Sequence, residues 1–303
     1  MHKISILMST YNGEKYIKQQ IESIKNQSIK SIHLFVRDDG STDGTQEILQ
    51  DYQNNGMLTW YQGKNIGAGQ SFLELTRKTE AAEYYAFADQ DDYWDKEKIE
   101  KAIQKLEQYQ DIPCMYCSNL HVVDKNLLSY PTQYDNSNVY MGLESSMLYN
   151  LATGCTIVFN HKLQEILQKY SPKNILYHDW WVYLLALTFG KVIYDKSSYI
   201  KYRQHDSNVV GFKPAKRNLK WIINKLIGCE NTVRWNKGRS YIVELYQGYA
   251  ASLDKQQKDF FYNIIHFKES YKVRIKLCFL GNLSKNGFLK AAFIKFFVLL
   301  GKD

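Results

Sequence analysis

Residues 84–94 read YYAFADQDDYW, an apolar run that ends in three carboxylates within four residues. The run has the length of a buried strand, and Asp89, Asp91 and Asp92 follow it directly. Crowded carboxylates repel one another unless a cation binds them, and Mg²⁺ and Mn²⁺ prefer carboxylate and phosphate oxygens. Asp89-Gln90-Asp91 is therefore a candidate clamp for a metal–diphosphate unit. The alternative is a solvated acidic turn that caps the next helix, a role equally open to Asp92.

The sequence around this stretch alternates between strand and helix patterns. Strands separated by helices of this length predict an α/β fold with a mostly parallel sheet flanked by helices. Ligands of such sheets bind at the carboxyl ends of the strands, so the residues directly after each strand form the candidate site. Strand patterns lie at 4–8, 32–36, 58–61 and 84–88, and helical patterns at 15–27, 45–52, 70–79 and 96–109.

Beyond residue 110 the pattern changes. Strand patterns at 115–123 and 153–159 precede a helix at 178–189 and two short strands within 191–203, and the polar residues 130–149 are expected to form a loop. From about residue 213 the chain is basic and helical. The predicted organisation is an α/β domain at 1–212, which the change of pattern divides at about residue 110, and a basic helical region at 213–303.

The charge of the 303-residue chain is unevenly distributed. Residues 1–200 carry 19 Lys and Arg against 24 Asp and Glu, a net −5, whereas residues 201–303 carry 20 against 7, a net +13. Basic helical segments with interspersed aromatic residues, at 213–240 and 268–300, are typical of helices that lie on an anionic membrane surface. The alternative is a packed helical subdomain with a solvated basic face. No nucleic-acid recognition motif accompanies the charge, so nucleic acid is not an expected partner.

Cysteine usage and the start of the chain indicate the compartment. Five cysteines, an odd number, follow an N-terminus without a signal-peptide pattern, which predicts a reducing, cytoplasmic location. Cys114 and Cys117 have redox or zinc spacing, but they lie in a strand-like run without a second pair, so two cysteines on one strand is the favoured interpretation. The most apolar segment, 287–300, contains Lys290 and Lys295 and is too short to span a membrane.

One glycine-rich motif is set aside. Gly67-Ala68-Gly69 resembles the start of a dinucleotide-binding fingerprint, but Phe72 stands where the third glycine belongs, and the motif does not follow the first strand.

The strand-end motifs together resemble the family-two glycosyltransferases with the GT-A fold, a Rossmann-like arrangement. Segments near the end of the predicted α/β domain look like the bacterial rhamnosyltransferase branch that builds cell-wall and capsular polysaccharides. The match covers roughly residues 3–212, and it implies that 1–212 is the catalytic domain, with a donor half at about 1–110 and an acceptor half at about 111–212. The motifs that carry it are Ser9-Thr10-Tyr11-Asn12-Gly13, residues 38–44 (DDGSTDG), Asn65-x-Gly67, residues 87–94 (FADQDDYW), residues 178–181 (HDWW) and residues 202–208 (YRQHDSN).

The resemblance implies a role for each matching residue. Ser9, Tyr11 and Asp39 would hold the nucleotide, with Asp39 accepting a hydrogen bond from the pyrimidine N3–H. Asp91 and His205 would ligate Mg²⁺ or Mn²⁺ on the diphosphate, with Asp92 as a further candidate ligand. Asn65 is also implied to contact the donor, and Asp89 would lie near the ribose. Gly154 belongs to the Thr153-Gly154-Cys155 loop, which would lie under the sugar. Arg203 would pair either with phosphate or with a nearby carboxylate.

Asp179 matches the position of the family's catalytic base. A carboxylate there would remove the proton from the acceptor hydroxyl as it attacks the anomeric carbon, so that no covalent intermediate is needed. A helix N-cap is the alternative role for this residue.

The expected function is therefore transfer of a sugar from a nucleotide diphosphate-sugar, with inversion, in polysaccharide biosynthesis. The favoured donor is dTDP-rhamnose, and the favoured acceptor is a lipid-linked glycan at the inner face of the cell membrane, where the enzyme would bind peripherally. The alternatives are another UDP- or dTDP-hexose or galactofuranose donor, or a non-catalytic nucleotide-sugar-binding scaffold. A nucleotidyltransferase is disfavoured because residues 9–13 lack the Lys and Arg of a phosphate-binding loop.

Overall fold

The computed structural model describes residues 3–131, 141–147, 149–206 and 229–278. The chain divides into two compact units, which are described separately. The first comprises Met1–Ser137, Ala152–Lys169 and Leu176–Lys213, and the second comprises Asn138–Leu151, Tyr170–Ile175 and Pro214–Asp303.

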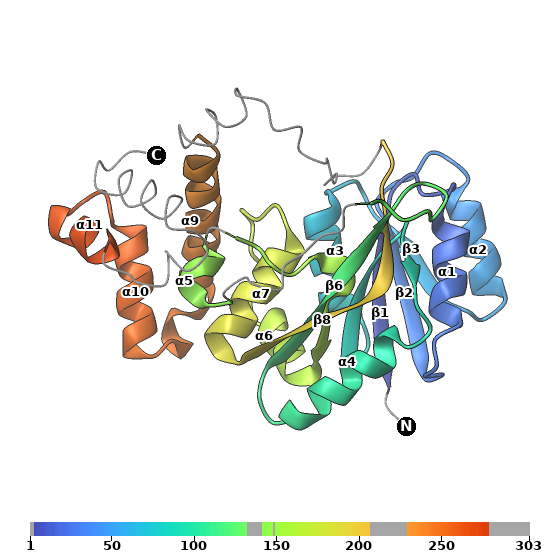
Figure 1. Cartoon of the computed structure of the whole chain (residues 1–303), viewed down its shortest axis with the longest axis horizontal. Helices are drawn as coiled ribbons and strands as arrows, with labels where there is room; N and C mark the ends of the chain where they lie inside the picture. The colour runs from blue at the N-terminus through green and yellow to red at the C-terminus, as the bar shows by residue number, and fades with distance from the viewer. Residues whose placement is uncertain (1–2, 132–140, 148, 207–228, 279–303) are drawn as a thin grey trace. The chain divides into compact units, whose positions relative to one another are not determined.

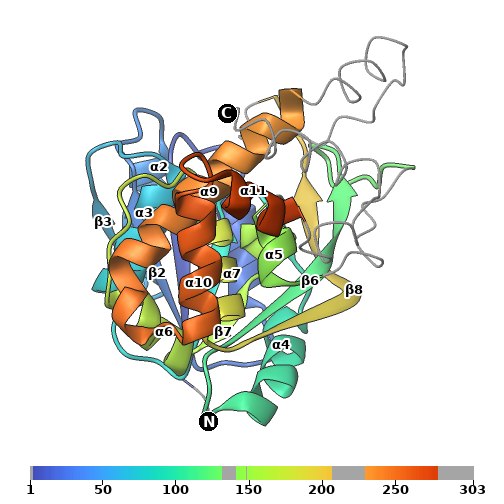
Figure 2. The same cartoon turned by 90° about the vertical axis from the view of Figure 1, so that its left-hand side faces the viewer.

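The first unit is built on an eight-stranded sheet with helices on both faces (Figure 1). The strand order is β3-β2-β1-β4-β7-β6-β8-β5, so β3 lies toward one edge and β6 and β8 toward the other (Figure 2). Strands β3, β2, β1 and β4 are parallel, whereas β7 runs antiparallel to both of its neighbours. The predicted α/β fold with a mostly parallel sheet is confirmed. The strands are β1 (Ile4–Thr10), β2 (Ile32–Asp38), β3 (Thr59–Gln62), β4 (Tyr84–Asp89), β5 (Tyr93–Trp94), β6 (Cys114–Val123), β7 (Val158–Asn160) and β8 (Lys191–Arg203).

Helices cover both faces because the central strands are apolar on both sides. On one face, side chains of β1, β2 and β4 form a core with α1 (Ile17–Lys25), α2 (Thr45–Asn54) and α4 (Lys98–Leu106). On the other face α3 (Ala68–Lys78), α6 (His161–Gln168) and α7 (His178–Phe189) pack against one another. Completely buried strands read as continuous apolar runs rather than as alternating ones. This is why the sequence from Ile4 to Met8 shows little alternation.

Three sequence expectations differ from the structure. In the range 153–159, expected to be a strand, residues Gly154–Thr156 form a 3-10 helix and the strand β7 begins only at Val158. Residues 191–203 form the single long strand β8 rather than two short strands, because they pair with β6 along their whole length. The register of this pairing shifts near Ser118 and Asn119, and the shift interrupts the regular strand pattern in the sequence of β8. Residues 143–146 form the short helix α5 (Leu143–Ser146) within the predicted loop. The two cysteines with redox spacing, Cys114 and Cys117, lie buried on β6, as the sequence indicates.

The second unit is helical, with α5, α9 (Cys229–Tyr249), α10 (Lys255–Ile265) and α11 (Tyr271–Cys278). Glu244 of α9 is 1% exposed and accepts hydrogen bonds from the Tyr170 hydroxyl (2.8 Å) and from the backbone N–H of Asn174 (2.7 Å). None of the described helices combines the length and the hydropathy needed to cross a membrane. Ser207, Asn208 and most of the basic aromatic segments lie outside the described residues.

Asn160 joins three elements of the first unit. Its Oδ1 accepts hydrogen bonds from Leu163 N (3.1 Å), which caps α6, and from Cys114 N (3.0 Å) at the start of β6. Its Nδ2 donates to the carbonyl oxygens of Tyr109 (2.9 Å) and Ile112 (2.8 Å). The side chain is 3% exposed, so all four bonds are made away from water.

We predict that Asn160→Ala lowers the free energy of unfolding by about 2–4 kcal/mol, because it leaves several buried backbone groups unpaired. Asn160→Asp should also destabilise the protein, since it keeps both acceptor bonds but places a carboxylate oxygen against two carbonyls. Urea unfolding measures both changes. Asn55→Ala, which removes one exposed side-chain bond to Asp51 O, is the control and should change stability by less than about 0.5 kcal/mol. A loss at Asn160→Ala as small as at the control would contradict the interpretation.

Candidate active site

The loops after β1 and β4 are joined by the middle residue of the acidic motif. Ser9 of β1 lies beside Asp89 of β4 in register. Gln90 accepts a hydrogen bond from Tyr11 N (2.9 Å) and donates one to Tyr11 O (3.1 Å). The Tyr11 side chain projects from this rim, with 48% of the residue exposed. The two loops therefore form one surface, with Asp89 and Asp91 on either side of the Gln90 contact.

Asp39 anchors the loop that contains Asn65. Its carboxylate pairs with Arg37 and accepts hydrogen bonds from the backbone N–H groups of Ile66 (3.0 Å) and Gly67 (2.9 Å). Arg37 and Asp39 are both 2% exposed, whereas Asn65, in the loop before α3, is exposed. The carboxylate predicted to recognise the nucleotide base is thus already bonded to protein donors. A carboxylate has about four acceptor positions, so these bonds occupy most of them.

Asp91 and His205 come together from positions 114 residues apart. The Asp91 Oδ2 lies 2.7 Å from His205 Nε2, and the two side chains are 14% and 12% exposed. The Tyr16 ring lies 4.8 Å from the His205 ring, centroid to centroid. A carboxylate oxygen and an imidazole nitrogen are ligands that suit Mn²⁺, and the carboxylate suits Mg²⁺. The chain thus provides two adjacent ligand atoms on the rim of the sheet.

Arg203, at the end of β8, holds the turn that carries Asp91. Its Nε donates to Asp91 O (2.6 Å), and its other guanidinium nitrogens donate to Lys125 O (2.7 Å) and Gln19 Oε1 (2.5 Å). The Arg203 backbone N–H donates to Asp92 Oδ1 (3.1 Å). The residue is 2% exposed, so its guanidinium faces protein groups on several sides. The phosphate contact foreseen for Arg203 stays a prediction.

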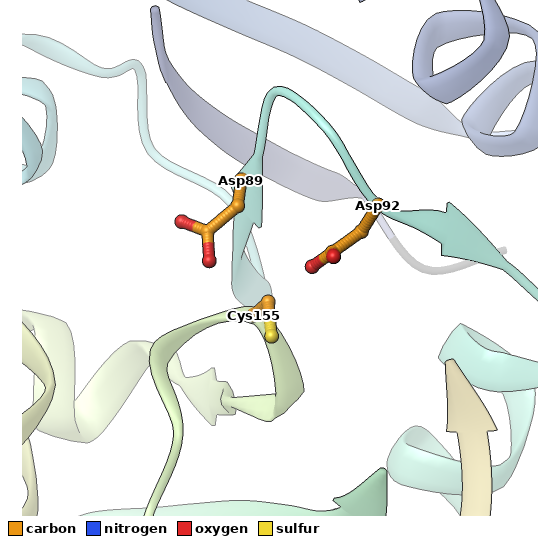
Figure 3. A group of neighbouring side chains, drawn as sticks. All are labelled: Asp89, Asp92 and Cys155. Carbon is orange, nitrogen blue, oxygen red and sulfur yellow. The ribbon is translucent and has the colours of Figure 1, made fainter. Parts of the chain in front are cut away.

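Asp92 and Cys155 are buried, and the partly exposed Asp89 lies beside them. The three side chains are neighbours (Figure 3), and one ligand atom of each residue lies within 4.8 Å of the others. Burial, and then the nearby charges of Asp91 and Asp179, raise the pKa of Asp89 to about 7. Burial, and then the charges of Asp91 and Asp89, raise the pKa of Asp92 well above its ordinary range. Across the described ranges, this is the one group of three His, Cys, Asp or Glu side chains close enough to share a metal ion.

Lys98 is a buried cation beside this acidic group, and the sequence analysis did not single it out. It is 1% exposed, and its Nζ lies 3.7 Å from the centre of the Trp94 ring. Burial lowers its pKa to about 8, and the carboxylates of Asp92 and Asp89 oppose that shift. The position was detectable: Lys98 is in line with the apolar stripe of α4, one turn before Ala102 and two before Leu106. A cation beside the acidic pair argues against a second cation at Asp92.

Asp179 lies in the first turn of α7 and its carboxylate is partly exposed. Oδ1 accepts a hydrogen bond from Trp180 N (2.6 Å), and Oδ2 accepts one from Gly154 N (3.2 Å). Its charge contributes to the raised pKa of Asp89, which places the two carboxylates near each other. A partly exposed carboxylate with its orientation fixed by backbone N–H groups is suited to act as a general base.

His178 precedes Asp179 and is enclosed by aromatic rings. Its ring stacks on Phe72 at 4.0 Å and meets Phe87 edge-on at 4.7 Å, centroid to centroid. Burial lowers the pKa of His178 to about 3. An unfolded histidine has a pKa near 6.5, so the unfolded chain binds more protons between pH 6.5 and 3. The folded protein is therefore destabilised as the pH falls through this window.

We predict that His178→Phe reduces this acid sensitivity. The unfolding free energy of the variant relative to wild type should increase as the pH falls from 7 to 4, by up to about 1.4 kcal/mol per unit, because the variant has no group to protonate. Urea unfolding at several pH values measures the difference. Phe159→Leu removes a buried ring that packs on Tyr85 and Phe87 and introduces no titrating group, so it should shift stability equally at every pH. A constant difference for His178→Phe would show that His178 is protonated in the folded state too.

The sequence of this chain is similar to those of known glycosyltransferases. Residues 5–172 match the model of "Glycosyl transferase family 2". The dTDP-rhamnosyl transferase RfbG of Shigella flexneri is 30% identical over 244 residues, which cover 72% of this chain and 80% of that protein.

Two solved structures share the fold. The crystal structure of S. aureus TarS 1–349 in complex with UDP-GlcNAc aligns with a TM-score of 0.59 at 17% identity, over 99% of this chain and 92% of that chain. The mannosyltransferase PcManGT from Pyrobaculum calidifontis, in complex with GDP-Man and Mn²⁺, aligns with a TM-score of 0.53 at 15% identity, over 97% and 86% of the two chains. The extent of the family match, together with the relative at 30% identity, shows that the chain belongs to glycosyltransferase family 2.

Proposed function

We propose that this glycosyltransferase is metal-dependent and inverting, and that it moves L-rhamnose from dTDP-rhamnose to a lipid-linked glycan in polysaccharide biosynthesis. The observation that carries the proposal is the convergence of three groups from distant parts of the chain. Asp91 contacts His205 at 2.7 Å, and Asp179 lies close enough to Asp89 to raise its pKa. Ligand atoms for a cation and a candidate base thus lie at the same end of the sheet.

Asp179 is proposed as the general base. The N–H groups of Gly154 and Trp180 fix its two oxygens, so the carboxylate keeps one orientation while it accepts the proton of the acceptor hydroxyl. An acceptor activated on the face of the sugar opposite the diphosphate attacks the anomeric carbon directly. The configuration of that carbon then inverts, and with a dTDP-β-rhamnose donor the product is α-linked.

Asp91 and His205 are proposed to hold Mg²⁺ or Mn²⁺. Their hard oxygen and nitrogen atoms fit such an ion, and the crowding of Asp89, Asp91 and Asp179 favours added positive charge. A divalent cation offsets the negative charge that develops on the departing diphosphate. Arg203 supports this site by holding the carbonyl group of Asp91. Asp92 is a weaker candidate ligand because its carboxylate is directed toward Cys155.

The donor nucleotide is proposed to bind along the rim formed by the ends of β1, β2 and β4. Tyr11 presents an exposed ring there, and a pyrimidine N3–H would compete for one oxygen of Asp39 with the loop at Ile66 and Gly67. The residues proposed to contact the donor are Ser9, Tyr11, Asp39, Asn65, Asp89, Gly154 and Arg203.

The choice of rhamnose rests on similarity to RfbG, a protein named as a dTDP-rhamnosyl transferase. Another UDP- or dTDP-linked hexose or galactofuranose remains the alternative within the class. A non-catalytic scaffold is the alternative outside it, and the paired Asp91 and His205 and the oriented Asp179 favour an enzyme.

We propose that the enzyme works at the cytoplasmic face of the membrane, where a lipid-linked acceptor is presented. Residues 201–303 carry 20 Lys and Arg against 7 Asp and Glu, which favours contact with anionic headgroups. In the described part of this region, the exposed Tyr271 and Ile275 each directly precede an exposed lysine of α11, Lys272 and Lys276.

We predict that Asp91→Ala weakens donor binding at least about tenfold and abolishes its dependence on metal, because the cation loses its carboxylate ligand. Calorimetric titration with dTDP-rhamnose, UDP-glucose, UDP-galactose and UDP-GlcNAc, with and without Mn²⁺, measures the change and identifies the donor. Asp111→Ala, which removes an exposed carboxylate from a loop, is the control and should bind like wild type. Tight binding that ignores both metal and Asp91 would contradict the metal site, and selective binding of a UDP-hexose would overturn the rhamnose assignment.

Asp179→Asn should leave the affinity for the donor within about threefold of wild type and lower the turnover number by about 10²–10⁴. The amide has the same shape and still accepts a backbone hydrogen bond, but it no longer takes up a proton. Titration of the donor and release of nucleoside diphosphate, with water as the acceptor, measure the two quantities. Wild-type turnover in this variant would mean that another group is the base.

A further inference from the structure

The glycine-rich segment at 67–72, GAGQSF, is not explained by the proposed function. It resembles a dinucleotide fingerprint only in part, and in the structure it forms the first turns of α3. This helix lies against α7, whose first turn contains Asp179 (Figure 1).

Gly69 is the point where α3 approaches the chain that leads into α7. It is buried, and a Cβ atom added there would overlap the carbonyl oxygen of Leu176 and lie 3.4 Å from Tyr177 N. Tyr177 is the N-cap residue of α7. Any larger side chain at position 69 would therefore displace the start of that helix, because the nearest atoms are backbone atoms of Leu176 and Tyr177 with little freedom to move.

Phe72 makes the next contact, one turn along α3. Its ring stacks on His178 at 4.0 Å with an interplanar angle of 28°, and Phe87 closes the other side at 4.7 Å. His178 Nε2 has no hydrogen-bond partner among the described residues. The ring is therefore held by shape and stacking, and the backbone of His178 continues directly into Asp179.

The His178 ring also packs against Gly154, the second residue that holds the Asp179 carboxylate. Gly154, whose N–H donates to Asp179 Oδ2, packs so closely on His178 that an added Cβ would lie 2.8 Å from Nε2. The position of His178 therefore influences both the helical turn that carries Asp179 and the loop that orients its carboxylate.

From these contacts we infer that Gly69 and Phe72 of α3 are positioning residues for Asp179, acting through the backbone at Leu176 and the ring of His178. The inference rests on the proposed role of Asp179 as the base. The competing explanation is that α3 acts through the donor site, because the N–H groups of Ile66 and Gly67, directly before α3, donate to Asp39. Donor affinity and turnover distinguish the two explanations.

The test is Phe72→Leu, which keeps an apolar side chain but removes the ring beneath His178. The probe is dTDP-rhamnose with Mn²⁺, or whichever donor of the panel binds, with water as the acceptor. Turnover, measured as release of nucleoside diphosphate, should fall about tenfold or more, because a displacement of about 1 Å at a catalytic group costs up to about 10²-fold. The dissociation constant of the donor should stay within about twofold. Gly69→Ala should produce the same pattern.

The matched control is Phe159→Leu. Phe159 is fully buried and its ring contacts Phe87 at 5.3 Å, so the change removes an equivalent aromatic ring next to the same partner. Its turnover should stay within about twofold of wild type. Equal losses of turnover in Phe72→Leu and Phe159→Leu would overturn the inference, and so would a loss in Phe72→Leu that is explained by weaker donor binding.

Failure of this inference is distinguishable from failure of the proposed function. If Asp179→Asn turns over like wild type, the base assignment fails, whatever Phe72→Leu does. If Asp179→Asn is inactive while Phe72→Leu and Gly69→Ala turn over normally, the base assignment stands and the positioning role of α3 is wrong.

Discussion

The mutual repulsion of carboxylates at one end of the sheet is the constraint on which the rest of the site depends. The charges of Asp91 and Asp179 add to burial in raising the pKa of Asp89, and Asp92 is a buried acid next to Asp89. Such crowding is tolerated only where positive charge or hydrogen-bond donors oppose it. The protein supplies both: Lys98 lies beneath the pair, and His205 and the Arg203 backbone N–H contact Asp91 and Asp92.

The strand order explains how one sheet delivers these groups to the same place. Strands β1, β2 and β4 are parallel, so their carboxyl ends meet at one rim. Because β7 runs antiparallel to β4, the segment before it, which contains Gly154 and Cys155, lies beside the end of β4. Strand β6 reverses direction again and β8 runs parallel to it, so Arg203 and then His205 reach the same rim. The antiparallel strand thus adds the second half of the site to a parallel sheet.

The sequence predicts the fold and the rim better than it predicts side-chain partners. Strand ends are detectable because apolar runs end abruptly in polar residues, as at Asp89. The resemblance of the motifs placed Asp91 and His205 in the same predicted metal site. The Arg37–Asp39 pair and the bonds of Arg203 were not predictable, because the direction of a side chain depends on register and turn geometry. The single strand β8 was missed for a related reason: its shifts of register interrupt the regular pattern.

Burial and bonding partners, rather than residue type, separate the roles of the acids in this site. Asp92 is fully buried beside a thiol and an ammonium group, an environment that suits a structural acid. Asp91 keeps some exposure and faces an imidazole, an arrangement open to a cation from outside. Asp179 is partly exposed, and the backbone N–H groups of Gly154 and Trp180 fix the direction of its carboxylate. The proposed base has to stay within reach of the acceptor hydroxyl, which full burial like that of Asp92 would prevent. The rings of Phe72 and Phe87 pack around His178, the residue before Asp179, so the turn that carries the proposed base is supported by packing that does not bury Asp179 itself.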